Sequence, residues 1–184
     1  MKIMKILLIA IVCILIICVV VYAYYGGFKR LKIEIVEQGG EFVIYDTIVG
    51  DYRQSGIVMD KIYYSLLNDF KIETYKGYGK YFDNPKKVEK SKLRSEAGCI
   101  IESKDINKAK ASNIYKSKNL PVQRYIISEF PYKGKLSVLF SIMRVYPALS
   151  KFATINGFND DGAIIEIYDI PNKKIFYRKE IVEK

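Results

Sequence analysis

Residues 163–171 read AIIEIYDIP, a strand-like run of apolar residues that stops at a proline. Residues 78–85, YGKYFDNP, form a similar run earlier in the chain. Both runs end in Asp-x-Pro, and the two endings lie 86 residues apart. Self-similarity at a fixed spacing is typical of a repeated structural unit. The sequence therefore predicts an α+β fold built from a duplicated β-α-β-β unit.

The expected elements follow from apolar periodicity and from turn residues. The first unit contains a strand at 42–49, a helix at 55–70 and strands at 78–83 and 93–102. The second contains a strand at 122–130, a helix at 136–155 and strands at 163–169 and 174–182. A strand at 31–37 lengthens one sheet edge, and the lysine-rich stretch 103–120 is a loop or a weak edge strand. We expect one curved antiparallel sheet, two helices on one face and an open groove on the other.

Each expected helix carries an apolar stripe that we expect to face the sheet. The stripe of the first helix is Ile57, Val58, Ile62, Leu66 and Leu67, and that of the second is Leu139, Met143, Tyr146 and Leu149. On this interpretation Leu66 and Leu149 are core residues at corresponding places in the two units.

Residues 6–25, ILLIAIVCILIICVVVYAYY, carry no charge. As a helix this run is about 30 Å long, the thickness of a bilayer's hydrocarbon core. It predicts a transmembrane anchor over residues 1–28 and a folded domain over residues 29–184, in a single-pass membrane protein. The alternative is a cleaved signal peptide, whose apolar region is about 7–15 residues long. Orientation stays open, because basic residues flank both ends of the run.

Composition excludes several kinds of function. The chain has no histidine, which removes Ser-His-Asp catalysis, Cys-His catalysis, imidazole metal sites and histidine-ligated haem. Cys99 is the one cysteine outside the apolar run, so the domain has no internal disulfide. The net charge is +10, but the lysines are spread among 20 carboxylates and form no arginine-rich helix. We expect no cofactor, no metal and no nucleic-acid partner.

Strand alternation predicts the direction in which the Glu166 side chain points. Ile165 and Ile167 share one face, which we expect to lie under the helices, so that Glu166 and its neighbour Tyr168 face the open groove. A partly buried carboxylate is costly unless it is paired. The alternative is an exposed glutamate paired with a basic residue of the next strand, either residue 178 or residue 179.

Three short sequence motifs resemble those of the GyrI-like effector-binding family, which is related to the SOUL haem-binding fold. They are GDY at 50–52, YFDNP at 81–85 followed by LR at 93–94, and EIY at 166–168. Their order and spacing match across about residues 31–183. The chain also resembles a membrane-anchored branch that includes an ER-phagy receptor, through its apolar run and through FPY at 130–132. That receptor's autophagy motif lies in a disordered tail, and we expect no such role here.

The resemblance implies a binding module for hydrophobic or cationic small molecules. Family members hold such ligands in an aromatic groove, with the EIY-type glutamate near the positive charge, which implies this role for Glu166. Candidate walls are Tyr81, Tyr168, Tyr45 and Phe130, and each aromatic face attracts a cation by about 0.5–2 kcal/mol. Two alternatives stay open. The groove could hydrolyse strained, cyclopropane-bearing molecules, with the carboxylate as base. The domain could also be a membrane scaffold that contacts lipid or protein.

Overall fold

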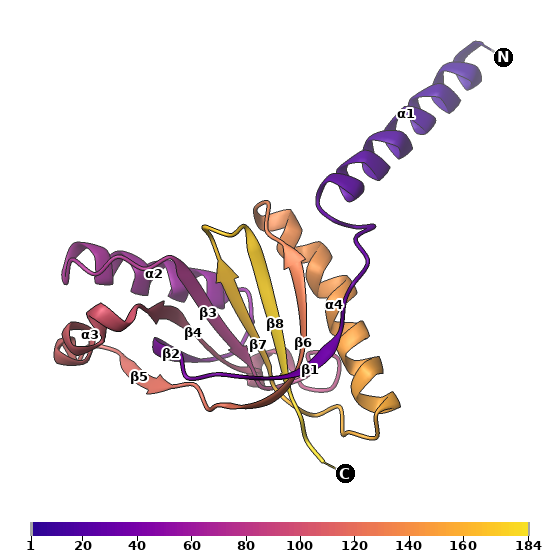
Figure 1. The fold of residues 1–184 in the computed structure, drawn as a ribbon. Helices are drawn as coiled ribbons and strands as arrows, with labels where there is room; N and C mark the ends of the chain where they lie inside the picture. Colours follow the sequence, from indigo (N-terminus) through magenta and orange to yellow (C-terminus); the bar gives the residue numbers. More distant parts are fainter. Residues whose placement is uncertain (1, 184) are drawn as a thin grey trace.

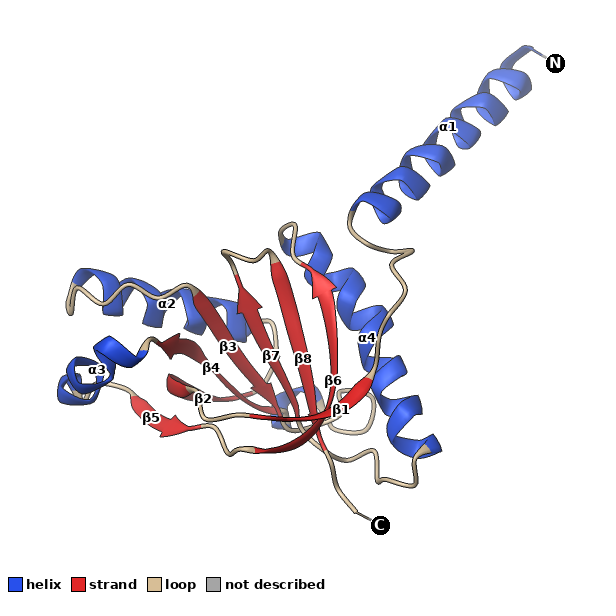
Figure 2. Ribbon diagram, in the orientation of Figure 1, coloured by secondary structure: helices blue, strands red, loops and turns tan. Residues whose placement is uncertain are grey.

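The computed structural model describes residues 2–183. Within that range the chain forms an α+β fold with one eight-stranded sheet and four α-helices (Figure 1; Figure 2). The helices are α1 (Lys2–Tyr24), α2 (Gln54–Asn68), α3 (Ile106–Ser112) and α4 (Lys135–Ile155). The strands are β1 (Glu34–Gln38), β2 (Phe42–Val49), β3 (Lys76–Tyr81), β4 (Arg94–Ile101), β5 (Lys116–Asn119), β6 (Gln123–Pro131), β7 (Ile164–Asp169) and β8 (Lys174–Glu180). Single 3₁₀ turns, η1 (Lys90–Lys92) and η2 (Ser103–Asp105), precede β4 and α3.

The sheet has the strand order β1-β6-β8-β7-β3-β4-β2-β5, and every pairing is antiparallel. The segments β2-α2-β3-β4 and β6-α4-β7-β8 have the same connectivity, and they meet where β3 pairs with β7. The predicted early strand is β1, at one edge. The stretch predicted as a loop or a weak edge strand contains η2, α3 and the edge strand β5.

The sheet curls strongly because two short connections join strands from its opposite halves. Residues 39–41 link β1 to β2, and residues 120–122 link β5 to β6. Figure 2 shows both connections passing below the sheet. They are bonded to each other: the Gly40 amide donates to the Leu120 carbonyl, and the Leu120 amide to the Glu41 carbonyl, each at 2.8 Å. At Gly39 an added Cβ would meet the carbonyl oxygen of Pro121 at 2.0 Å, so the crossing requires glycine.

Side chains fill the inside of this curve, where the sequence predicted an open groove. The buried members of this interior cluster are Val43, Tyr78, Ile100, Leu120, Tyr125, Ile165 and Ile167. The convex face carries α2 and α4, each over its own apolar cluster. The cluster under α2 contains Leu66 and the cluster under α4 contains Leu149, and both leucines are fully buried as predicted.

The predicted helix stripes were partly wrong. Ile57 of α2 is 72% exposed, and Leu139 and Met143 of α4 are 52% and 65% exposed. The face of α4 that contacts the sheet consists of mostly smaller residues: Ser137, Ser141, Val145, Leu149 and Ala153. Small side chains let a helix lie close to the strands, so the larger apolar residues of its first half point outward.

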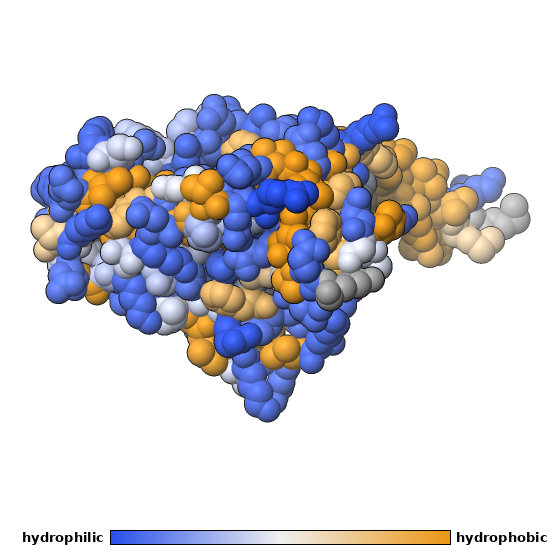
Figure 3. Space-filling view, turned by 60° about the horizontal axis from the view of Figure 1, so that its bottom comes forward, coloured by the Kyte–Doolittle hydropathy of each residue, from blue (hydrophilic) through white to orange (hydrophobic). Residues whose placement is uncertain are grey.

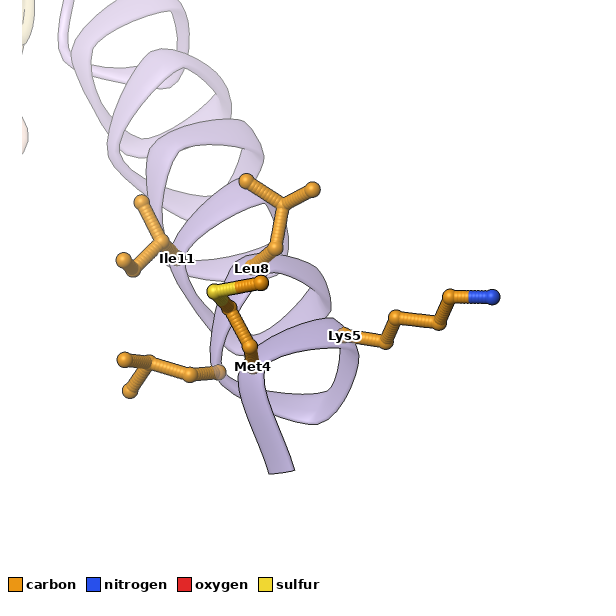
Figure 4. A pocket seen from close by; sticks show the side chains of 5 residues that line it. Met4, Lys5, Leu8 and Ile11 are labelled. Carbon is orange, nitrogen blue, oxygen red and sulfur yellow. The ribbon is translucent and has the colours of Figure 1, made fainter. Parts of the chain in front are cut away.

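Helix α1 projects from the domain and has no buried residue (Figure 1). Figure 3 shows it as an orange, apolar extension of a mixed surface. Met4, Leu8 and Ile11 lie together along this helix, and Lys5 extends away from them (Figure 4). Its 23 residues include a window of mean hydropathy 3.5, long and apolar enough to cross a membrane. Helix α4 meets the same criterion at 1.2, although part of it is buried in the domain.

Candidate functional site

Glu166 lies in the middle of β7 and is 1% exposed. Its side chain faces α4: the Tyr146 hydroxyl donates to Oε1 at 2.8 Å, and the Tyr168 hydroxyl donates to Oε2. The expectation that Glu166 faces away from the helices was wrong. The other face of β7 carries Ile165 and Ile167, which pack inside the curved sheet. Both faces of this strand are buried, so alternation could not tell them apart.

No lysine or arginine within residues 2–183 forms an ion pair with Glu166. Arg178, one of the two predicted partners, binds Glu41 through two hydrogen bonds of 2.6 and 3.0 Å. Lys179, the other, donates to the carbonyls of Asp160 and Gly162. The alternative of an exposed, lysine- or arginine-paired glutamate is therefore wrong, and the polar contacts of Glu166 are tyrosine hydroxyls.

The electrostatics of this cluster follow from its burial. Burial raises the pKa of Glu166, although the hydrogen bonds from Tyr168 and Tyr146 lower it in part. Burial and the nearby Glu166 charge raise the pKa of Tyr146 and of Tyr168 well above the ordinary phenol value. These hydroxyls therefore remain protonated donors in the physiological range. When Glu166 is ionised, these hydroxyls solvate the carboxylate without neutralising its charge.

Two glycines of β3 make room beside the carboxylate. Gly79 lies opposite Glu166 in the sheet, and Gly77 lies opposite Tyr168. An added Cβ at Gly77 would approach the sulfur of Met59 to 2.5 Å, and one at Gly79 would approach the Tyr81 hydroxyl to 3.1 Å. The space above β3 is thus filled by the side chains of Met59, from α2, and of Tyr81. A methionine thioether is flexible, so this filling can rearrange.

Two of the motifs that resemble the family, GDY at 50–52 and YFDNP at 81–85 with LR at 93–94, contact each other around Tyr81. The Tyr52 hydroxyl donates to the Asp83 carbonyl at 2.8 Å, and Arg94 binds the Asp83 carboxylate in a bidentate arrangement, with a 2.7 Å contact from Nη2. The Tyr52 ring packs edge-on against Tyr81, with 4.9 Å between centroids. These residues shape the site without contacting Glu166.

The predicted site residues lie in three places. Glu166, Tyr81 and Tyr168 lie on the helix-covered face. Tyr45 lies on the opposite face, against Tyr78, with the Lys118 ammonium 4.4 Å from its ring centroid. Phe130 is fully buried in the core under α4 and belongs to the packing of that helix.

Sequence reasoning missed several residues of the cluster. Tyr146 was interpreted as helix packing, although its hydroxyl binds Glu166. Tyr177 bonds to Ser141 at 2.5 Å and packs edge-on against Tyr146, and Tyr132 packs edge-on against Tyr168. The only signal in the sequence was the count of 16 tyrosines, which does not say which of them share a face.

A hollow of about 390 Å³ lies beside β1, on the face opposite the helices. Its lining comes from β1, β6, β8 and the segment before β1: Lys32, Glu34, Gln38, Ile127, Ser128, Glu129, Phe176 and Tyr177. Both of its carboxylates are paired, Glu34 with Lys32 at 2.7 Å and Glu129 with Lys174 at 2.8 Å. The hollow therefore offers no unpaired carboxylate to a cation. No cluster suited to a metal ion occurs within residues 2–183.

The fold is structurally similar to that of GyrI-like effector-binding domains. The C-terminal domain of EcmrR matches with a TM-score of 0.53 at 9% identity, over 84% of this chain and 98% of that one. SAV2435 bound to tetraphenylphosphonium matches with a TM-score of 0.53 at 11% identity, over 83% and 93%. EcmrR in its complex with DNA matches with a TM-score of 0.59 at 11% identity, over 90% of this chain and 64% of that chain.

Similarities at this level of identity show a shared fold and leave function to be argued from the site. No protein-family model matches the sequence, and no curated protein matches it. The comparisons give no support to the narrower resemblance to a membrane-anchored branch.

Proposed function

We propose that this chain is a membrane-anchored domain that binds hydrophobic cationic small molecules, with Glu166 as the counter-ion. The observation that carries the proposal is a buried carboxylate without a cationic partner, held by Tyr146 and Tyr168 beneath the helices. SAV2435, which shares the fold, was solved with tetraphenylphosphonium bound.

The surroundings of Glu166 favour a cation over other ligands. A buried charge with no counter-ion is unfavourable, and an incoming cation relieves that cost. The rings of Tyr146, Tyr168 and Tyr81 offer aromatic faces, each worth about 0.5–2 kcal/mol to a cation. Binding requires Met59 and Tyr81 to move away from the glycine-lined stretch of β3. The ligand replaces side chains that fill the site when it is empty.

The anchor part of the proposal rests on α1. The helix has 23 residues, none of them buried, and is long enough for the hydrocarbon core. Its apolar run exceeds the usual length of a signal-peptide core. Tyr22, Tyr24 and Tyr25 lie at its domain end, where aromatic side chains favour the membrane interface.

Titration of the full-length protein in detergent micelles with tetraphenylphosphonium tests the ligand. Glu166→Gln keeps the size of the side chain and removes its charge. We expect the affinity to fall by about 1–3 kcal/mol, roughly 5- to 150-fold in Kd, the range for losing a charge-assisted contact. Isothermal titration calorimetry measures the change, and circular dichroism checks that the fold is kept.

Two controls make this result specific. Tetraphenylborate has the same shape and the opposite charge, so the wild-type protein should bind it far more weakly. Glu129→Gln removes a carboxylate from the hollow beside β1 and should leave the affinity for tetraphenylphosphonium unchanged. Equal binding of both ions, or loss of binding in Glu129→Gln with none in Glu166→Gln, contradicts the assignment of Glu166.

The affinity should also depend on pH. The pKa of Glu166 is raised above its ordinary value of 4.5, so its neutral acid form persists to higher pH than in an exposed glutamate. Tetraphenylphosphonium does not titrate, so its affinity should fall as pH decreases through the raised pKa. The Glu166→Gln variant should show no such dependence. A wild-type affinity that is flat down to pH 4.5 would show that the carboxylate is not the counter-ion.

A further inference from the structure

The first half of α4 presents an apolar stripe to the outside of the domain. Its members are spaced at i, i+3, i+4 and i+7, which places them on one side of a helix: Leu136, Leu139, Phe140 and Met143. Leu139 and Met143 are more than half exposed, at 52% and 65%. The opposite side of the helix contacts the sheet. Helix α4 is therefore apolar on two sides, and the sheet covers only one of them.

The end of α1 is fixed against this same half of α4. Arg144 donates from Nη1 to the carbonyl of Gly26 at 2.9 Å, and Lys133 donates from Nζ to the carbonyl of Tyr24 at 2.8 Å. The ring of Tyr22 packs edge-on against Phe140, with 5.2 Å between centroids. In Figure 1 the domain end of α1 lies beside the N-terminal end of α4, and α4 runs across the direction of α1.

These contacts fix the depth of the stripe relative to a bilayer. If α1 spans the membrane, Tyr22 lies near the level of the headgroups. Phe140 contacts Tyr22, so the stripe around Phe140 lies at the same level. Lys133, whose ammonium binds the Tyr24 carbonyl, lies just before α4, and Lys135 begins the helix, where its long basic side chain can reach anionic headgroups. An apolar face with basic residues at its border is typical of a helix that lies in the membrane interface.

We propose that the first half of α4 lies in the membrane interface, with Leu136, Leu139, Phe140 and Met143 in the boundary between headgroups and acyl chains. The inference rests on α1 being a membrane span, as in the proposed function. It adds that the domain lies against the bilayer. Tyr146 follows Met143 by one turn of the same helix, so the Glu166 cluster is close to the lipid surface. A hydrophobic cation dissolved in the interface then reaches the site without crossing bulk water.

Spin labels on the full-length protein in vesicles test the depth. The vesicles consist of phosphatidylcholine with a minor share of phosphatidylglycerol. Three proteins each carry one labelled cysteine: native Cys13 in α1 with Cys18→Ser, and Met143→Cys or Ile57→Cys with both α1 cysteines replaced by serine. Cys99 is 2% exposed and stays unlabelled in the folded protein. Ile57 is the matched control, because it is an exposed apolar residue of the other sheet-covering helix, at 72%.

Power saturation compares the access of oxygen, which concentrates in lipid, with that of a water-soluble nickel chelate. We expect the oxygen-to-nickel ratio at position 143 to be several-fold higher than at position 57, and closer to that at Cys13. Equal ratios at 143 and 57, with a lipid value at Cys13, overturn the inference and leave the anchor standing. A label at 143 that neither reagent reaches shows a protein partner on the stripe and also overturns it. A water value at Cys13 overturns both the anchor and the inference.

Discussion

Replacing Glu41 with glutamine is expected to lower the free energy of unfolding by about 3 kcal/mol, at the lower end of the usual cost of breaking a buried ion pair. Glu41 lies in the β1–β2 connection, and its carboxylate binds Arg178 of β8 through two hydrogen bonds. Arg178 is 7% exposed, and its Nε has no hydrogen-bond partner within residues 2–183. The variant leaves that guanidinium buried without a counter-charge. We expect a loss at the lower end of the range for buried ion pairs because the Glu41 side chain is 27% exposed.

Urea unfolding of the full-length protein in micelles, followed by circular dichroism, measures the loss. The double variant Glu41→Gln, Arg178→Met removes both charges and should recover most of it, since apolar replacement of a buried pair is often neutral. A loss below about 1 kcal/mol in the single variant would show that Arg178 finds water instead.

The same pair gives a pH dependence of defined sign. Burial alone would raise the pKa of Glu41, but the hydrogen bonds and charge of Arg178 outweigh it and lower the pKa below 4.5. A carboxyl whose pKa is lowered by folding stabilises the fold above its unfolded pKa, and this contribution is lost as pH falls through the folded pKa. The difference in stability between wild type and Glu41→Gln should therefore shrink below pH 4.5.

Truncation of Leu66 or of Leu149 to alanine should each cost about 2–5 kcal/mol, because both side chains are fully buried and their loss leaves a cavity. They lie in separate clusters under α2 and α4, so the double variant should lose close to the sum. The matched control is Ile57→Ala, at an exposed position of α2, which should change stability by less than about 0.5 kcal/mol. Small losses at both leucines would contradict a core under each helix.

The order of the elements could be predicted from the sequence, because turn residues separate segments of distinct periodicity. The orientation of Glu166 could not. Alternation reveals the inner face of a strand only when the other face meets water, and β7 lies at the centre of the sheet with packed residues on both sides. The predicted inward-facing stripes of the helices were partly wrong for a related reason. The apolar stripe predicted that Leu139 and Met143 face inward, whereas small residues such as Ser141 and Ala153 contact the sheet.

The spacing of 86 residues between the Asp-x-Pro endings predicted the repeated topology but not the register of the strands. Lys80 precedes Glu166 by this spacing. Lys80 points into the curved interior and pairs with Glu180 at 2.6 Å, whereas Glu166 points toward α4. Neighbouring residues of a strand face opposite ways. Residues of β3 and β7 that share a face of the sheet are therefore separated by an odd number of positions, not by 86. The two copies are thus shifted by one position relative to each other, which puts Lys80 and Glu166 on opposite faces of the sheet. No pattern in the sequence indicates this shift.

The short edge strand β5 has a consequence for how copies of this protein meet, if α1 anchors them in a membrane as proposed. Open strand edges recruit other chains, and confinement to two dimensions raises the rate at which copies meet. Strand β5 is four residues long and carries two lysines, Lys116 and Lys118. The Lys118 ammonium turns inward to Glu96, and Lys116 reaches Thr47. Short length, positive charge and an inward-pointing lysine are the features by which native sheets discourage edge-to-edge aggregation. On the proposed anchor, β5 would therefore discourage neighbouring copies from extending one another's sheets.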